Sequence, residues 1–343
     1  MRVNEFRHKL TSEFPPLVLI LGTEAALRQE ALAAVRALIP TDQATMNYAV
    51  YDMRQTPVAV ALDDAASPPF FGDHRLVVIQ DPYFLTGEKA NGKVEHDLDA
   101  LTAYFKAPVD STIMVLVAPY EKLDERKRLT KALKQNALIV DVAPLDERSA
   151  KQAVLNALKQ RKLTVTADGI DALAQRANAD YSVMMAQLPK LALYAANGAV
   201  LDADAVAALV PKQLSDRVFD LVAAVLAKNV TEALSIYRDL LLQKEEPIRL
   251  NSLLLSQFRL LLQVQILAKQ GYSQGSVAST LKVHPYRVKL AWRSSGHLDP
   301  AALRNAYIGL VATEAAMKTG RVDKELAFEL FVLQYAAGTP IAP

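Results

Sequence analysis

The chain contains no cysteine among its 343 residues. This absence excludes disulfide bonds, thiolate nucleophiles and zinc sites with cysteine ligands. Aromatic residues make up only 7% of the chain, and the formal net charge is +2. Because the charges are nearly balanced, the chain as a whole has no strong attraction for nucleic acid. Any contact with DNA must therefore come from local groups of Lys and Arg.

The sequence also lacks a long uninterrupted apolar segment. The first ten residues are rich in charged side chains and contain no apolar stretch of the signal-peptide kind. The most apolar segment, residues 253–268, is interrupted by Ser256, Arg259 and Gln263. It falls short of the roughly 18 apolar residues expected of a membrane span. These features predict a soluble, cytoplasmic protein that does not bind a membrane.

Residues 1–143 alternate between short apolar runs and segments with apolar residues at helical spacing. Short apolar runs are typical of buried strands, and helices between them predict a mostly parallel sheet that is covered on both faces. The expected strands are residues 17–21, 47–51, 75–79, 112–117 and 138–142. The expected helices between them are residues 24–38, 58–65, 94–105 and 124–134.

After Pro144 the strand pattern almost disappears and helical patterns take its place. Those in residues 144–211 predict a small helical lid domain, and those in residues 212–337 predict a second all-helical domain. Residues 338–343 are predicted to be a disordered tail. The expected fold class is therefore α/β plus all-α. A parallel-sheet domain followed by a helical lid is the layout of AAA+ modules, so the first two domains are expected to be AAA+-like.

The turn after the first strand is the place where an AAA+ module would bind nucleotide. A phosphate-binding loop needs several glycines, a lysine and a Ser or Thr hydroxyl. Here Gly22 stands alone, and Glu24 competes with a phosphate for the helix dipole. The third strand ends at a single carboxylate, Asp81, and the fourth strand is followed by Pro119. The sequence predicts an ordinary turn here, with no catalytic, nucleotide or metal site and no cofactor.

Three segments resemble the delta subunit family of bacterial DNA polymerase III. The first is residues 22–31, the turn and helix that begin at Gly22. The second is residues 69–78, where Phe70 and Phe71 precede a glycine turn and a strand that begins with arginine. The third is residues 284–289, the run His-Pro-Tyr-Arg-Val-Lys, together with short matches in the helices around it. The order and separation of these segments fit the family over essentially the whole chain.

The resemblance implies a non-catalytic subunit of the DNA polymerase III holoenzyme, which is a nucleotidyltransferase. It implies an AAA+-like clamp-binding domain in residues 1–143, the lid in residues 144–211 and an oligomerisation collar in residues 212–337. The implied partners are the sliding clamp, the delta-prime subunit, the tau or gamma ATPase subunits and primer-template DNA. The family's apolar clamp-binding wedge falls at Phe70 and Phe71. The resemblance therefore predicts a subunit that holds the clamp ring open, and the residues missing at the ends of the strands predict that it does not hydrolyse ATP.

The residues around Phe70 and Phe71 help to decide whether these two aromatics are exposed, as a clamp-binding wedge requires. A proline pair before them and Gly72 after them place both aromatics in a turn. Adjacent phenylalanines often pack into the core of their own domain, and for Phe70 and Phe71 this is the alternative to a contact with the clamp. A turn beside a strand does not easily bury both rings in one direction, and an exposed ring is a candidate for an interface.

Two other functional interpretations remain open from the sequence. Residues 273–289 also fit a helix-turn-helix regulator in which Arg287, Lys289 and Arg293 face DNA. The near-neutral charge weighs against a regulator. In a clamp loader, the same three residues are candidates for contacts with the DNA backbone. The other interpretation is a working ATPase, which would bind ATP on its own.

Overall fold

The computed structural model describes residues 1–70, 72–88, 94–212 and 214–338. These residues form two compact units. Unit 1 consists of Met1–Leu145 and Asp180–Ala186, and unit 2 consists of Asp146–Ala179 and Gln187–Pro343. Phe71 and residues 339–343 of the predicted tail lie outside the described residues. The division into domains at residues 143, 211 and 337 stays a prediction.

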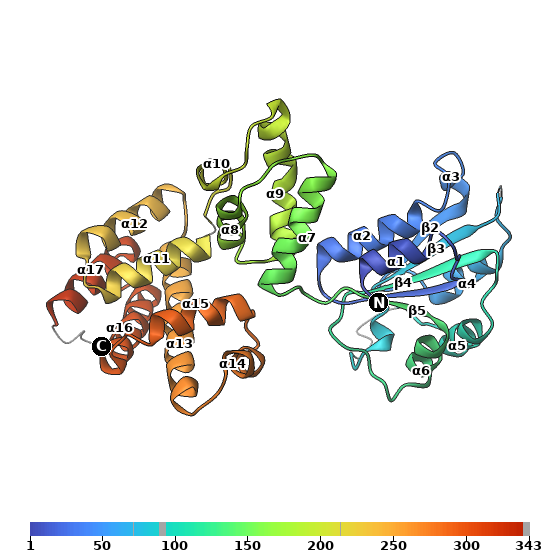
Figure 1. The fold of residues 1–343 in the computed structure, drawn as a ribbon. Coiled ribbons are helices and arrows are strands. Elements are labelled where there is room, and N and C mark those ends of the chain that lie inside the picture. Colours follow the sequence, from blue (N-terminus) through green and yellow to red (C-terminus); the bar gives the residue numbers. More distant parts are fainter. Residues whose placement is uncertain (71, 89–93, 213, 339–343) are drawn as a thin grey trace. The chain divides into compact units, whose positions relative to one another are not determined.

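Unit 1 is built on a five-stranded sheet in the order β2-β3-β4-β1-β5 (Figure 1). Every neighbouring pair of strands is parallel, as predicted. The strands are β1 (Leu17–Leu21), β2 (Tyr48–Asp52), β3 (Arg75–Gln80), β4 (Thr112–Ala118) and β5 (Leu138–Asp141). Each predicted strand is confirmed to within one residue at either end. Because the strands are parallel, their carboxyl ends meet at one edge of the sheet, which is where α/β proteins place their sites.

Helices cover both faces of this sheet (Figure 1). They are α1 (Val3–Lys9), α2 (Ala25–Arg36), α3 (Ala44–Asn47), α4 (Val58–Ala66), α5 (Leu98–Lys106) and α6 (Arg128–Asn136), with a 3-10 turn at Tyr83–Leu85. Leu19, Val77 and Leu116 belong to one core with residues of α4, α5 and α6. Side chains alternate between the two faces of a strand. Their neighbours Val18, Val78 and Val115, which are also buried, therefore point toward α1 and α2.

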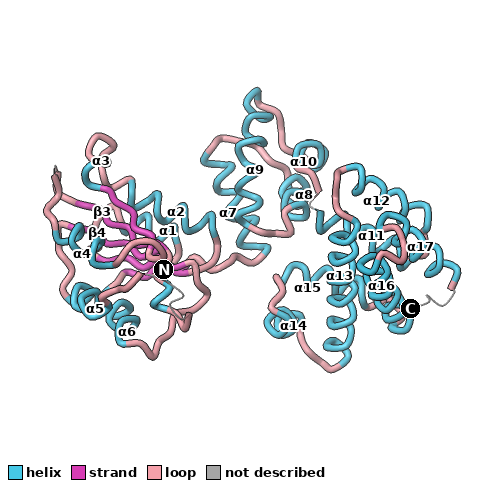
Figure 2. The backbone as a smooth tube through the Cα atoms, turned by 180° about the vertical axis from the view of Figure 1, so that it is seen from behind, coloured by secondary structure: helices cyan, strands magenta, loops and turns pink. Residues whose placement is uncertain are grey.

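Unit 2 consists of helices and loops, with one isolated bridge between Val165 and Leu201 within its described residues (Figure 2). Its helices include α7 (Glu147–Gln160), α8 (Ala167–Arg176), α9 (Tyr181–Tyr194), whose first residues belong to unit 1, and α10 (Ala203–Leu209). They continue with α11 (Leu214–Leu226), α12 (Val230–Leu242), α13 (Pro247–Lys269), α14 (Gln274–Leu281), α15 (Pro285–Ser295), α16 (Pro300–Thr319) and α17 (Lys324–Ala337). The predicted fold class, α/β plus all-α, is therefore present.

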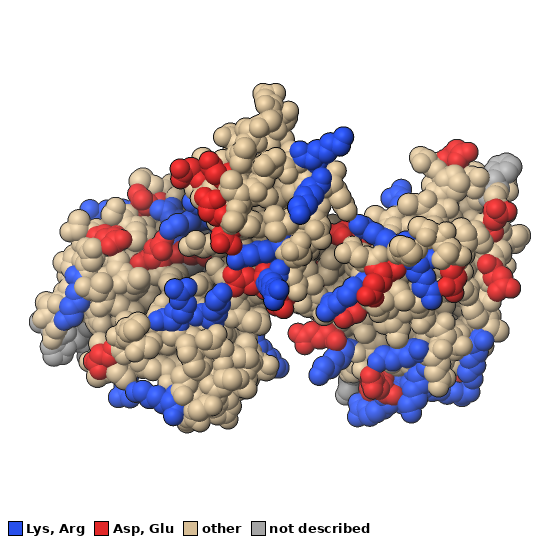
Figure 3. Space-filling view, viewed as in Figure 1, with Lys and Arg blue, Asp and Glu red and all other residues tan. Residues whose placement is uncertain are grey.

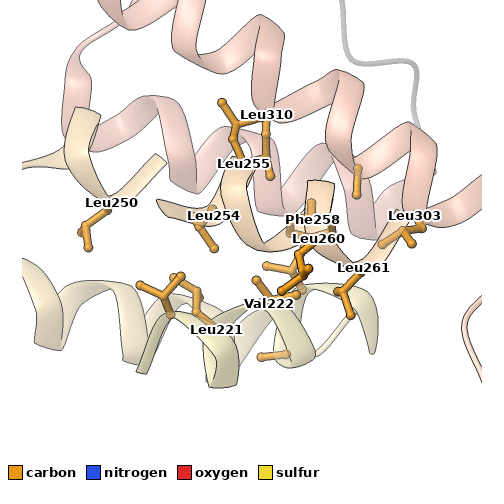
Figure 4. Packing of buried hydrophobic residues seen from close by; sticks show 14 of the residues in the cluster. Leu221, Val222, Leu250, Leu254, Leu255, Phe258, Leu260, Leu261, Leu303 and Leu310 are labelled. Carbon is orange, nitrogen blue, oxygen red and sulfur yellow. The ribbon is translucent and has the colours of Figure 1, made fainter. Parts of the chain in front are cut away.

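Helix α13 is the core helix of unit 2. Leu254 points toward Leu221 of α11 (Figure 4). Phe258 of α13 and Leu303 and Leu310 of α16 belong to the same core. By length and composition α13 could span a membrane, but 56% of its most apolar window is buried inside the protein. Burial within unit 2 therefore accounts for its apolar composition.

Candidate functional site

Phe70 lies in the turn between α4 and β3, and 62% of its surface is exposed. Its backbone N–H donates to the side-chain oxygen of Asn47 at 2.8 Å. Asn47 is fully buried at the end of α3. The backbone of Phe70 is therefore held by the interior while its side chain faces solvent, and Phe70 does not pack into the core. Phe71, its predicted companion, lies outside the described residues.

The same turn is anchored on its other side. Gly72 has a φ of +76°, and a Cβ there would lie 2.2 Å from the side-chain oxygen of Gln43, so the position favours glycine. Arg75, the first residue of β3, forms an ion pair with Asp64 of α4, and both side chains are mostly buried. Its guanidinium also donates to the carbonyl of Met46 at 3.4 Å. The turn thus presents Phe70 from a base tied to α3, α4 and β3, which lowers the cost of ordering it on binding.

The turn after β1 is closed by the protein itself. Glu24 precedes α2 and is 7% exposed. Ser182, from the segment of α9 that belongs to unit 1, donates its hydroxyl to the Glu24 carboxylate. The hydroxyl oxygen also accepts from the backbone N–H of Ala26 at 2.9 Å. A donor at this helix end is therefore satisfied internally, beside a negative charge that opposes phosphate binding.

Gly22 allows the close approach that shapes this turn. A Cβ there would lie 2.3 Å from the backbone carbonyl of Val142. A cavity of about 160 Å³ remains beside the turn, and its lining includes the acidic residues Glu121 and Asp141. Asp141 is paired with Arg2 at 3.4 Å, so the carboxylate of Glu121 is the charge here that disfavours a triphosphate by like-charge repulsion.

Asp81, at the carboxyl end of β3, is bound by a cation and a phenol. Arg54 donates from Nε to Asp81 and from both terminal nitrogens to Glu88, at 3.0 and 3.2 Å. The hydroxyl of Tyr120 also donates to Asp81. The hydrogen bonds with Glu88, and then the one with Asp81, raise the pKa of Arg54 above its already high usual value. Burial and the bond to Asp81 raise the pKa of Tyr120. A guanidinium thus occupies the carboxylate that a metal would need.

Sequence reasoning did not find Arg54 or Ser182. Arg54 meets Asp81 across 27 residues, and Ser182 meets Glu24 across 158 residues. No local pattern joins positions so far apart, so only the fold brings these side chains together.

The three predicted DNA-contact residues all lie on α15, but they differ in exposure and in their contacts. Lys289 forms an ion pair with Glu147 at 2.7 Å. Arg287 is half-buried and lines a cavity of about 490 Å³ within unit 2. Arg293 is exposed. The hydrogen bond from Lys289 is the main reason that the pKa of Glu147 is lowered.

A basic group that sequence reasoning did not single out lies over α5 and α6 of unit 1 (Figure 3). It includes the exposed residues Lys106, Arg128 and Lys131. The sequence does contain a signal for this basic group, because residues 126–134 include five Lys or Arg. Two of them have acidic partners: Arg126 pairs with an aspartate at 2.9 Å and Lys134 with a glutamate at 2.5 Å. This part of unit 1 therefore carries local positive charge that the near-neutral total conceals.

Comparison with known proteins shows first the class to which this chain belongs, the clamp-loader subunits. Residues 19–143 match the family described as DNA polymerase III, delta subunit, and residues 215–335 match the C-terminal domain of that subunit. The DNA polymerase III subunit delta of Bacillus subtilis (strain 168) is 39% identical over 324 residues, which cover 94% of this chain and 93% of that protein. The solved structure of the Bacillus subtilis DNA clamp loader delta protein has a TM-score of 0.74 and 37% identity, with 98% and 99% of the two chains covered.

The chain belongs to the DNA polymerase III delta subunit family. This confirms the resemblance inferred from residues 22–31, 69–78 and 284–289, and it confirms the fold class. It favours a replication subunit over a helix-turn-helix regulator. In addition, two of the three cations that a regulator would turn toward DNA are engaged within unit 2: Lys289 pairs with Glu147, and Arg287 is half-buried.

Proposed function

We propose that this chain binds the sliding clamp through Phe70 and Phe71 and holds the clamp ring open for loading on primed DNA. The observation that supports this most strongly is the exposure of Phe70, at 62%, on a backbone pinned by the buried Asn47. Burying a phenylalanine contributes roughly 1.5–3 kcal/mol. Two such residues are enough for the hot spot of an interface, since a few anchors carry most of the binding energy.

Ring opening follows from binding if the clamp conformation that fits the chain cannot close the ring. A ligand shifts such an equilibrium only by its differential affinity for the two states. A preference of about 100-fold for the open form corresponds to about 2.7 kcal/mol. Two aromatic rings that are buried only against the open form supply that amount, so no chemical step in this chain is required.

We infer further that the chain neither binds nor hydrolyses ATP and is a non-catalytic subunit of the polymerase holoenzyme. Support comes from the carboxylate of Glu24 and the hydroxyl of Ser182 at the start of α2. It also comes from the guanidinium of Arg54 on Asp81. The energy for loading then comes from the tau or gamma subunits, which act in the cytoplasm together with delta-prime.

The collar, residues 212–337, is the proposed site of assembly with delta-prime and with the tau or gamma subunits. Contacts with primer-template DNA are proposed for Arg287, Lys289 and Arg293. For Lys289 this requires that a phosphate compete with Glu147, whose carboxylate is 2.7 Å away.

The test is ring opening by the isolated chain. Two fluorophores placed across one subunit interface of the clamp report its opening as a loss of energy transfer. The wild-type chain should lower the transfer in the absence of nucleotide, and the double variant Phe70→Ala, Phe71→Ala should not. Unchanged transfer with the wild-type chain at saturating concentration would contradict ring opening. Saturable ATP binding by the isolated chain, measured by calorimetry, would contradict the proposed absence of an ATP site.

A further inference from the structure

Two other large apolar side chains are exposed beside the Phe70 turn. Phe14 lies between α1 and β1 and is 49% exposed, and Met46 lies in α3 and is 57% exposed. They come from different parts of the sequence, and neither belongs to the segment that resembles the family's wedge. Soluble proteins rarely gather exposed apolar side chains in one place unless that surface binds something.

Phe14 is fixed against the C-terminal end of the turn. Its ring stacks on the ring of His74, with centroids 4.4 Å apart and planes 22° from parallel. His74 stands directly before Arg75, the residue that ties the turn to α4. About half of Phe14 is still exposed although His74 covers part of its ring. A ring held by stacking has little conformational freedom left to lose on binding.

Met46 is fixed against the turn by its backbone. Its carbonyl oxygen accepts a hydrogen bond from the Arg75 guanidinium at 3.4 Å, and the next residue, Asn47, holds the N–H of Phe70. The Met46 side chain itself is exposed. An unbranched thioether adapts its shape to a partner, which suits the edge of an interface.

We propose that Phe14 and Met46 extend the clamp contact of Phe70, so that the clamp binds an apolar surface made by three segments of unit 1. This inference rests on the proposed function. A stable interface buries about 800 Å² on each partner and involves roughly 20–30 residues a side, far more than one turn provides. The clamp contact must therefore spread to neighbouring surface, and Phe14 and Met46 are exposed apolar residues tied by stacking or a hydrogen bond to His74 and Arg75.

The experiment is calorimetric titration of the purified clamp with the full chain and its single variants. Phe14→Ala and Met46→Ala should each weaken binding by about fivefold, a moderate effect for residues beside a hot spot. Their double variant should weaken it by about 25-fold, because effects of separate contacts are nearly additive. Val60→Ala is the matched control, because Val60 is 45% exposed in unit 1 but lies near the start of α4, away from the turn. The affinity of this variant for the clamp should not change.

The outcomes separate this inference from the function on which it rests. If Phe70→Ala weakens binding and the Phe14 and Met46 variants bind like the wild type, the extended surface is wrong and the clamp contact stands. If Phe70→Ala also binds like the wild type, the proposed function fails. Thermal melting checks that each variant is folded. Should Phe14→Ala not fold, Phe14→Leu and Met46→Ser carry the test, and wild-type affinity in both would overturn the proposal.

Discussion

Replacing Gly22 with alanine tests whether the turn after β1 is as tightly closed as the structure indicates. The new Cβ would lie 2.3 Å from both the carbonyl carbon and the carbonyl oxygen of Val142 and 2.6 Å from the nitrogen of Ala143. All three are backbone atoms and cannot rotate away. Gly22 also has a φ of +143°, which side-chain-bearing residues rarely adopt. Backbone strain of about 1–3 kcal/mol and overpacking of about 1–3 kcal/mol together predict a loss of about 2–6 kcal/mol from unit 1.

Urea unfolding followed by two probes localises this effect. Trp292, the single tryptophan, packs against the core of unit 2, so its fluorescence reports on unit 2. Far-UV circular dichroism reports on both units. With a urea dependence of about 1–3 kcal/mol/M, the Gly22→Ala transition in circular dichroism should begin roughly 2 M earlier, while the Trp292 transition stays in place. Gly87→Ala is the control, because among the described residues no atom lies within 4 Å of a Cβ at Gly87. Wild-type unfolding of Gly22→Ala would refute the reasoning.

Three further predictions concern polar contacts. Lys289→Met should lower the stability of unit 2 by about 0.5 kcal/mol at pH 7. Because Lys289 lowers the pKa of Glu147, this stabilisation is present above the usual glutamate pKa of about 4.3 and is lost as the pH falls through the lowered value. Thermal melts at pH 7 and pH 3 should therefore differ in the effect of the substitution, and an equal effect at both would contradict the ion pair. Ser182→Ala leaves Glu24 and the N–H of Ala26 without the hydroxyl and should destabilise unit 1 by about 1–3 kcal/mol in thermal melts; an unchanged melting temperature would show that this contact is not needed. Arg293→Ala in the assembled loader should reduce the salt dependence of primed-DNA binding by a slope of about 0.9 in fluorescence anisotropy, and an unchanged slope would exclude a phosphate contact.

The strands and most long helices could be predicted because their signal is local. The run Leu17–Leu21 is apolar because that strand is buried on both faces, and its bounds were predicted without error. Helix α1 was missed because only Val3 and Phe6 are buried among charged neighbours, which is too few for a helical period. The helix predicted to begin at residue 94 begins at Leu98, because the side chain of Asp97 caps it there.

The candidate site could be predicted only where sequence neighbours define it. The breakers around Phe70 indicate an exposed turn, and the structure has Phe70 exposed. Asn47, which holds the turn, is 23 residues away and carries no local signal for that role. Lys289 could be identified as a cation but not as the partner of Glu147, which lies 142 residues earlier. The sequence shows the chemical type of each side chain, but a partner that lies many residues away can be identified only from the folded structure.

The central claim is that Phe70 and Phe71 are the clamp anchors. The most direct test is a calorimetric titration of the purified clamp with the full chain and with the variant Phe70→Ala, Phe71→Ala, after melting curves confirm that both are folded. If each ring contributes about 1.5–3 kcal/mol on burial, the double variant should bind at least 100-fold more weakly. An affinity within twofold of the wild type would contradict the account.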